Sequence, residues 1–581
     1  MSYRAPVRDL AFALFEAAGL ERLAPFVPGL DRPMAEAVLE AAGELAAGVL
    51  APLNRVGDIQ GSRLENGRVV TPEGFKAAYR AFAEGGWTGL SADPAFGGQG
   101  LPKALELAVF ETVNSANMAF ALCPTLTQAA IEALQAHGTE RQRRLYLPGL
   151  VSGDWTGTMH LTEPQAGSDL AAIRTTAERA GDGSWRLHGQ KIFITWGDHD
   201  LADNIIHLIL ARTAGAPEGV RGLSLFVAPQ RMVGEDGRVG EANALRAASL
   251  EHKLGIHASP TCVMLYEGAR AELVGQEGQG LAHMFTMMNA ARVMVGVQGV
   301  GLAEAAFQQA LAYARERRQG RSEWSAERPA AIVDHPDVRR MLLLMKARTE
   351  AARAICLCAG VAADLSRLAD DEAVRTSAAL RSELLTPIAK AWSTDAGVEC
   401  ASLGVQVHGG VGFIEETGAA QLYRDARIAP IYEGTNGIQA IDLAGRKLQM
   451  GEGRAVRDLL DEMSALLPKV EGAQALARTG SQLREGLNTL EQASVWLGAR
   501  KGADAQAGAA AYLALWGDVL GGFLLAKMAL AAATGEDASY AARRALLARV
   551  YGDQVLAQAP GRIAAVTAGA EDLEASGPML Q

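Results

Sequence analysis

Cysteine is scarce in this sequence, and the few cysteines follow no pattern that holds a metal. Five occur among 581 residues: Cys123, Cys262, Cys356, Cys358 and Cys400. None belongs to the C-x-x-C or Cys/His spacing that is typical of a zinc site, so we expect no metal. A small, odd number of cysteines fits a reducing compartment, where thiols stay unpaired. We therefore expect buried free thiols and a cytoplasmic protein.

Long runs of like charge and long uncharged apolar runs are also missing. No long Lys/Arg run occurs, and a net charge of −11 disfavours nonspecific binding to nucleic acid. Glu16 interrupts the apolar segment 11–20, which is unlike a secretory signal. Asp518 and Lys527 lie in the most hydrophobic late segment, 509–528, whereas a membrane span needs about 20 residues almost free of charge. The sequence predicts no signal peptide, no membrane span and no nucleic-acid partner.

The balance of residue types predicts a large folded chain. Aromatic residues make up only 6% and charged residues 21%, but hydrophobic residues reach 49%, which excludes disorder and provides for large cores. A chain of this length should form three or four domains. We predict an α+β fold, mainly α, with an N-terminal helical domain (1–155), a central antiparallel β domain (156–275), a helical-bundle domain (276–452) and an additional C-terminal helical domain (453–581).

Hydrophobic spacing suggests these divisions. Apolar residues recur at helical spacing in 34–50, 105–122, 284–317 and 338–364. The short β-rich runs 185–188, 192–195, 205–211 and 223–228 are separated by Gly, Asp and Pro. Their connections lack the helices that a parallel sheet needs, so we expect an antiparallel sheet.

One carboxylate, Glu433, stands between an aromatic residue and a Gly-Thr pair in the segment IYEGTNGIQ, residues 431–439. It precedes an apolar run typical of a helix, so it could stabilise the first helical turn through the dipole. Burial would give it another role, because desolvation raises the pKa of a glutamate from about 4.3 by up to several units. Such a carboxylate is suited to removing a carbon-bound proton near neutral pH. The segment alone leaves both interpretations open.

Three further segments precede this one: TEPQAGSD (162–169), GQKIFIT (189–195) and QVHGGVGF (406–413). The four together resemble the signature segments of the acyl-CoA dehydrogenases, in the same order and at similar spacing. The resemblance extends to both ends of the chain in a long bacterial branch of that family, which carries an extra C-terminal domain. It implies an enzyme that binds FAD and oxidises an acyl-CoA thioester.

The resemblance implies a flavin site on the β domain. Met159, Leu161 and Thr162 are expected to line the flavin, and Thr162 adds a hydroxyl group. Gly167 lets the backbone come close to the ligand. Ser168 is implied to contact the pantetheine or phosphate part of the CoA thioester. Read without the resemblance, TEPQAGSD would be a capped turn between a strand and a loop.

The strand GQKIFIT is implied to flank the flavin ring. Phe193 occupies the position where many relatives carry Trp; it can still shield the dimethylbenzene edge, with less area and no N–H. Thr195 matches the residue that donates a hydrogen bond to flavin N5. Taken alone, both would be ordinary strand residues. In the catalytic segment, the resemblance assigns Thr435 and Gly437 to the cofactor as well.

The anionic pyrophosphate of FAD needs positive charge and backbone donors. Arg317 and Gln319 lie in the run RERRQGR, which could also be a solvated helix end. The resemblance implies that they reach the pyrophosphate of a neighbouring subunit. Gln406, Gly409 and Gly410 match the segment that approaches the same dinucleotide.

The reaction implied by the resemblance removes an α proton while a β hydrogen leaves as hydride to flavin N5, giving a trans-2-enoyl-CoA. Glu433 is the implied base, and its N–H helps to polarise the thioester carbonyl. Some relatives carry the base immediately before an Arg that matches Arg292, but this chain has Ala291 there. Asn289, Arg292 and Gly434 are implied to contact the substrate.

The implied partners are an acyl-CoA substrate, an electron-transfer flavoprotein and a second copy of the chain, as a homodimer or alternatively a homotetramer. Two other functions share the motifs. An acyl-CoA oxidase would return electrons to oxygen. A DNA-associated flavoprotein of the same superfamily would need a cationic surface, whereas residues 456–581 are slightly acidic. The acyl group itself stays open.

Overall fold

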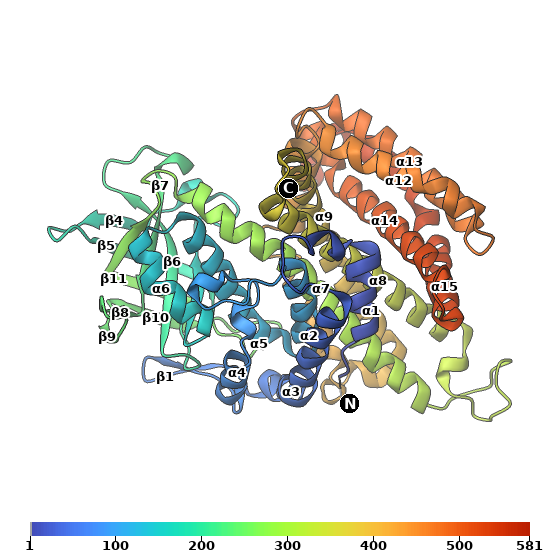
Figure 1. The fold of residues 1–581 in the computed structure, drawn as a ribbon, viewed down its shortest axis with the longest axis horizontal. Coiled ribbons are helices and arrows are strands. Elements are labelled where there is room, and N and C mark those ends of the chain that lie inside the picture. Colours follow the sequence, from blue (N-terminus) through green and yellow to red (C-terminus); the bar gives the residue numbers. More distant parts are fainter. Residues whose placement is uncertain (1–2, 581) are drawn as a thin grey trace.

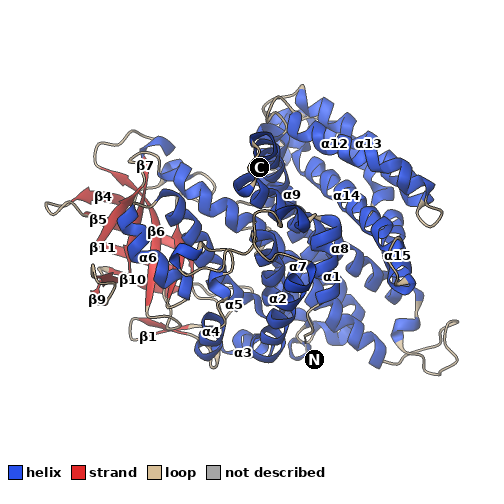
Figure 2. Ribbon diagram, viewed as in Figure 1, coloured by secondary structure: helices blue, strands red, loops and turns tan. Residues whose placement is uncertain are grey.

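Helices make up most of the computed structural model, which describes residues 3–580, and the strands gather at one end of the molecule (Figures 1 and 2). The predicted fold class, α+β and mainly α, is confirmed. All five cysteines are buried and unpaired. Among the described residues, no group of three or more His, Cys, Asp or Glu side chains is arranged to hold a metal ion.

The N-terminal region is helical, apart from a short hairpin. Its elements are α1 (Val7–Phe12), α2 (Arg32–Leu45), α3 (Ala51–Gln60), β1 (Arg63–Glu65), β2 (Arg68–Val70), α4 (Phe75–Glu84), α5 (Lys103–His137) and α6 (Glu140–Ser152). The long helix α5 is kinked at Asn117, whose backbone is extended rather than helical. Thr139 and Gln142 form a capping box that begins α6 and satisfies free N–H groups of its first turn.

A seven-stranded sheet follows. Its strands are β3 (Trp155–His160), β4 (Thr176–Arg179), β5 (Trp185–Thr195), β6 (Asn204–Thr213), β7 (Leu223–Pro229), β10 (Leu245–Leu250) and β11 (Thr261–Val274). Their order is β10-β11-β5-β4-β6-β3, and β7 pairs with both β11 and β6. The hairpin β8 (Arg231–Val233) and β9 (Val239–Ala242) lies outside this sheet.

The sheet departs from the expectation in two places. Most pairs are antiparallel as predicted, but β3 and β4 each pair in parallel with β6. The crossover that a parallel pair requires is made here by other strands rather than by a helix. The runs 185–188 and 192–195 are one continuous strand, β5, because Gly189 and the residues after it stay paired with β11.

The next region is built on three long helices: α7 (Gly280–Glu316), α8 (Pro336–Leu368) and α9 (Glu372–His408), followed by the short α10 (Ala419–Ala426) and α11 (Asn436–Asp442). Helices α7 and α9 approach closely through glycines. A Cβ on Gly299 would lie 2.4 Å from the main-chain oxygen of Ser393, and one on Gly296 would lie 2.5 Å from that of Ala389. This contact brings the side chains of the two helices together around the segment before α11.

The C-terminal region lies against α8 and α9 (Figure 1). It comprises α12 (Arg454–Gly472), α13 (Ala477–Gly498), α14 (Ala503–Ala533), α15 (Ala538–Gln554), α16 (Arg562–Thr567) and α17 (Glu571–Ala575). Helices α7 and α14 are long and apolar enough to cross a membrane, but 83% of each apolar stretch is buried inside the protein. Both therefore serve as core helices here.

Candidate active site

The segment that carries Glu433 connects α10 to α11 and contains two successive residues with left-handed backbone. Glu433 has a φ of 55° and Gly434 one of 82°. A left-handed φ is uncommon for a residue with a side chain and strains the backbone, which is a feature typical of functional sites. Thr435 then caps α11, accepting a hydrogen bond from the N–H of Ile438 at 3.1 Å. The glutamate therefore precedes the helix cap instead of occupying it.

Two buried cations hold the main chain of this turn. Arg292, on α7, donates from Nε to the main-chain oxygen of Glu433 at 3.2 Å and from Nη1 to Asn289 Oδ1 at 3.0 Å. Lys390, on α9, donates from Nζ to the main-chain oxygen of Gly434 at 2.8 Å. Each of the two successive carbonyl groups is thus fixed by a cation from a different helix.

The Glu433 carboxylate itself forms no ion pair within 4.0 Å in the described part of the chain. It keeps part of its surface accessible, yet burial raises its pKa to about 7, with Arg292 and Lys390 opposing the rise. Burial lowers the pKa of Lys390 to about 7, with Glu433 opposing. The neighbouring Tyr432 donates its hydroxyl to Gln298 Oε1 on α7. The carboxylate is therefore poised to exchange a proton near neutral pH.

A buried ion pair between Glu163 of the loop TEPQAGSD and Lys191 of β5 fixes this loop to the sheet. Lys191 Nζ donates to Glu163 Oε1 at 2.8 Å and to the main-chain oxygen of Leu161 at 2.9 Å. Burial alone would raise the pKa of Glu163, but Lys191 and the donors of Thr175 and Arg174 hold it at about 2. The loop is therefore fixed without using the side chains of the predicted ligand residues Leu161, Thr162 and Ser168.

Phe193 is turned out of the sheet by a β-bulge. The register of β5 and β11 shifts so that Ile192 and Phe193 together oppose Val263. Phe193 has a φ of 60°, and 58% of its surface is exposed. Bulges of this kind re-aim side chains beside functional sites. An exposed aromatic ring on the strand beside TEPQAGSD is suited to covering a flat ligand.

The residues present fit a flavin. Only main-chain groups of Thr162 and Thr195 form hydrogen bonds with other described residues, so both hydroxyl groups can serve a ligand. A Cβ on Gly167 would meet nothing within 4 Å, so a ligand has room to approach the backbone at this residue. Met159 and Leu161 share a hydrophobic cluster with Met288, three residues before Ala291 on α7. That cluster joins the β region to the helix that carries Arg292.

The predicted pyrophosphate residues lie elsewhere in the chain. Tyr313 near the end of α7 stacks on His408 at the end of α9, with ring centroids 4.5 Å apart. The residues beside them, Arg317, Gln319, Gln406, Gly409 and Gly410, are all exposed. At 1.5 Å per residue, Arg317 lies roughly 37 Å along α7 from Arg292. The structure thus separates these residues from the group around Glu433, as a site shared between two copies would require.

Several residues of the site were not predicted. Lys390 and Asn436 hold the turn, and Glu163 and Lys191 anchor the loop. One signal was available for Lys390: it is a lone charge in the otherwise uncharged stretch LLTPIAKAW. A lysine there must be buried with partners or face a site. The partners themselves lie 44 and 46 residues away in sequence, so spacing gives no hint of them.

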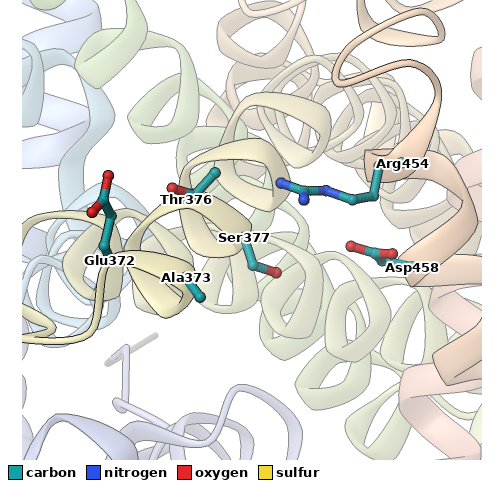
Figure 3. A pocket seen from close by; sticks show the side chains of 6 residues that line it. All are labelled: Glu372, Ala373, Thr376, Ser377, Arg454 and Asp458. Carbon is teal, nitrogen blue, oxygen red and sulfur yellow. The ribbon is translucent and has the colours of Figure 1, made fainter.

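A cavity of about 530 Å³ lies between α9 and α12 (Figure 3), lined by Glu372, Ala373, Thr376, Ser377, Arg454 and Asp458. Arg454 extends from α12 toward Thr376 and Ser377. The cavity adjoins the first turns of α9, and Ser377 lies roughly 20 Å along that helix from Lys390. It contains none of the predicted site residues, so it is separate from the catalytic segment.

Four family models match the chain. They describe the acyl-CoA dehydrogenase N-terminal domain (residues 34–154), its middle domain (158–269), its C-terminal domain (278–448) and an acetyl-CoA dehydrogenase C-terminal-like region (459–576). The chain is 48% identical over 579 residues to 3-methylmercaptopropionyl-CoA dehydrogenase of Ruegeria pomeroyi, covering 98% of both chains.

Two solved structures share the fold. Caenorhabditis elegans ACDH-11 in complex with C11-CoA matches with a TM-score of 0.82 at 22% identity, over 100% of this chain and 95% of that one. An acyl-CoA dehydrogenase complexed with FAD from Bacillus anthracis matches with a TM-score of 0.76 at 20% identity, over 96% and 91%. The chain belongs to the acyl-CoA dehydrogenase family. It is an FAD-dependent oxidoreductase that dehydrogenates acyl-CoA thioesters.

Proposed function

We propose that Glu433 is the base of this dehydrogenation and removes the α proton of the acyl-CoA thioester. The observation that carries the proposal is a carboxylate with a pKa near 7, outside any ion pair, on a turn whose two carbonyl groups are each held by a cation. A base with a pKa of about 7 is about half ionised at neutral pH, and its ionised form is basic enough to accept a carbon-bound proton. Bound FAD would supply the acceptor for the β hydrogen, which would leave as hydride, and the product would be a trans-2-enoyl-CoA.

The main chain of Glu433 has a second task. Its N–H has no hydrogen-bond partner among residues 3–580 and is free to donate to the thioester carbonyl. That donor stabilises the negative charge that develops on the carbonyl oxygen as the α proton leaves. A fixed donor of this kind contributes about 3–4 kcal/mol to catalysis. Because Arg292 and Lys390 fix the following peptide groups, the turn is already oriented before substrate binds.

We assign the cofactor to the predicted residues of the β region and the catalytic segment. Phe193 covers the flavin, Thr195 and Thr162 offer hydroxyl groups to its polar edge, and Gly167 allows close approach. The remaining contacts are assigned to Met159, Leu161, Ser168, Thr435 and Gly437. Ser168, Asn289, Arg292 and Gly434 are assigned to the substrate, with Arg292 near the CoA end.

A second copy of the chain completes the FAD site in this proposal. Arg317, Gln319, Gln406, Gly409 and Gly410 bind the pyrophosphate of the partner's FAD, which is supported by the roughly 37 Å that separates Arg317 from Arg292 along α7. Beside them Val411, Phe413 and Ile414 expose apolar surface, and Phe413 is 86% exposed. An apolar surface next to a cationic helix end favours a protein-covered face. We propose a cytoplasmic homodimer; a homotetramer is the alternative that a mass measurement distinguishes.

The substrate is proposed to be a short acyl-CoA thioester of the kind that includes 3-methylmercaptopropionyl-CoA. Identity of 48% along 98% of the chain supports that assignment. Electrons are proposed to leave through an electron-transfer flavoprotein. The test is a panel of straight-chain and thioether-bearing acyl-CoA thioesters, assayed with a dye that replaces the flavoprotein and with peroxide detection. Turnover with the dye and little peroxide is expected; peroxide at the rate of turnover would instead identify an oxidase.

A further inference from the structure

The turn at Glu433 is strained, so something outside it must keep it in place. Gly434 adopts its positive φ at no cost, but Glu433 carries a side chain, and such a residue keeps a positive φ only when its surroundings over-determine it. Arg292 secures the first carbonyl group and Lys390 the second. Lys390 is completely buried in the middle of α9, where an ammonium group without partners would be costly. The hydrogen bonds of Lys390 to the Gly434 carbonyl group and to Asn436 therefore explain why a lysine is buried here.

We propose that Lys390 is a positioning residue, which fixes the Glu433–Gly434 turn in its reactive orientation and sets the charge that faces the base. This inference rests on the proposed role of Glu433. Lys390 acts through the main chain and through its charge, and it does not contact the substrate.

Asn436 is the second hydrogen-bond partner of Lys390 in this segment. Lys390 Nζ donates to Asn436 Oδ1 at 2.9 Å. The amide group of Asn436 donates in turn to the main-chain oxygen of Ala391 at 3.1 Å, to Thr394 Oγ1 at 3.0 Å and to Asp395 Oδ1 at 2.8 Å. The first residue of α11 is thus bonded to one turn of α9, with Lys390 between it and the Gly434 carbonyl. A displacement of Lys390 would release both sides of the turn.

The packing of α7 on α9 explains why this lysine reaches the turn. Gly296 of α7 allows the main chain of Ala389 to approach, and Ala389 precedes Lys390 directly. On α7, Arg292 lies one helical turn before Gly296. The close helix contact therefore brings Arg292 and Lys390 to the same short segment from two sides.

The charges around the base decide the sign of the effect. Arg292 on α7 and Lys390 on α9 both lower the pKa of Glu433, against burial. The charged groups that face these two cations are Asp395, Asp442, Arg446 and Glu383. Among residues 3–580, removal of the Lys390 charge leaves Arg292 as the remaining cation that lowers the pKa of Glu433. The base should then need a higher pH to ionise.

The experiment compares three variants of the FAD-loaded enzyme. Lys390→Met removes both charge and donors, Lys390→Gln removes the charge but keeps an N–H donor, and Asn436→Ala keeps the charge but removes the anchor. Profiles of kcat/KM against pH are measured with the dye, and hydrogen exchange is measured for residues 431–439.

In Lys390→Met we expect the acidic limb, the pH range in which kcat/KM rises with pH, to move up by about one pH unit. The plateau, the constant value of kcat/KM above that range, should fall about tenfold. Hydrogen exchange of residues 431–439 should accelerate. Lys390→Gln should show the same limb shift with a smaller loss of plateau. Asn436→Ala should accelerate exchange and lower the plateau while the limb stays in place. Hydrogen exchange in Asn436→Ala also tests the anchor if the Lys390 variants do not fold.

Lys103→Met is the matched control, because Lys103 is another buried lysine, paired with Glu106 and Glu132 on α5. It should lower the unfolding temperature without moving the limb or the exchange of 431–439. A wild-type limb and wild-type exchange in folded Lys390→Met would overturn the inference, as would unaltered exchange in Asn436→Ala. If Glu433→Gln keeps wild-type turnover, the assignment of the base fails instead, and the two failures are distinguishable.

Discussion

Arg292 donates to the main-chain oxygen of Glu433 at 3.2 Å rather than to its carboxylate. The cation therefore holds the residue without neutralising the side chain in a tight ion pair. A direct ion pair would stabilise the ionised form and lower the pKa of the carboxylate by roughly 1–3 units. The observed arrangement keeps the pKa near 7, which a base for a weak carbon acid needs.

The first prediction concerns the two functions of Arg292, its charge and its Nε donor. Arg292→Met removes a charge that lowers the pKa of Glu433, so the acidic limb of kcat/KM should move to higher pH. Arg292→Lys retains the charge and loses the fork that reaches both Glu433 and Asn289. It should keep the limb in place and lower kcat, by about tenfold for one charged hydrogen bond. An acidic limb at the same pH in the wild type, Arg292→Met and Arg292→Lys would contradict the separate roles of the charge and the Nε donor.

The second prediction concerns the pH dependence of the wild-type enzyme. The pKa of Glu433 is raised to about 7, and only the ionised form accepts a proton. The value of kcat/KM should therefore fall tenfold per pH unit below about 7 and level off above it. A dye-linked assay with a substrate that does not itself titrate reports this limb. A limb near the ordinary pKa of a glutamate would mean that the carboxylate is solvated.

The third prediction concerns Phe193 as the wall of the flavin. Because 58% of its surface is exposed, Phe193→Ala should change the stability of the FAD-free protein little. The same variant should lose FAD during gel filtration, which the ratio of flavin to protein absorbance measures. Phe193→Trp, which restores a larger ring, should retain FAD at least as well as the wild type. Full FAD retention by the alanine variant would show that the ring contacts no cofactor.

The fourth prediction concerns the joint between α9 and the C-terminal region. Asp518 on α14 is buried and accepts hydrogen bonds from Trp392 Nε1 at 3.0 Å and Arg562 Nε at 2.8 Å. Asp518→Ala should lower the free energy of unfolding by about 2–3 kcal/mol, because the Trp392 donor is left buried and unpaired. Asp518→Asn keeps an acceptor for Trp392 and should cost less. Urea unfolding followed by tryptophan fluorescence compares the two, and equal stability of the alanine variant and the wild type would contradict the role.

The fold class and the long helices could be predicted from the sequence, because burial of one face of a helix makes apolar residues recur at a regular spacing. The segment 284–317 was predicted as a long periodic segment and is α7, Gly280–Glu316. The parallel pairs at β6 and the bulge at Phe193 were not predicted, since both depend on which strands become neighbours. Local propensity contains no information about that choice.

The site residues likewise fall into those that could be predicted from their neighbours in the chain and those that depend on contacts between distant elements. A carboxylate in a signature segment can be recognised by its neighbours in the chain, as Glu433 was. Lys390 contacts that segment from another helix, and its role follows from the glycine contact between α7 and α9. The roles assigned to the flavin and substrate residues stay predictions until a complex is studied.

The most direct test of the central claim is an anaerobic titration of FAD-loaded Glu433→Gln with the best substrate of the panel. The glutamine is nearly isosteric and cannot accept the α proton, so the variant should stay yellow. Bleaching of the flavin band should be at least about 100-fold slower than in the wild type. Bleaching at the wild-type rate would show that another group removes the proton.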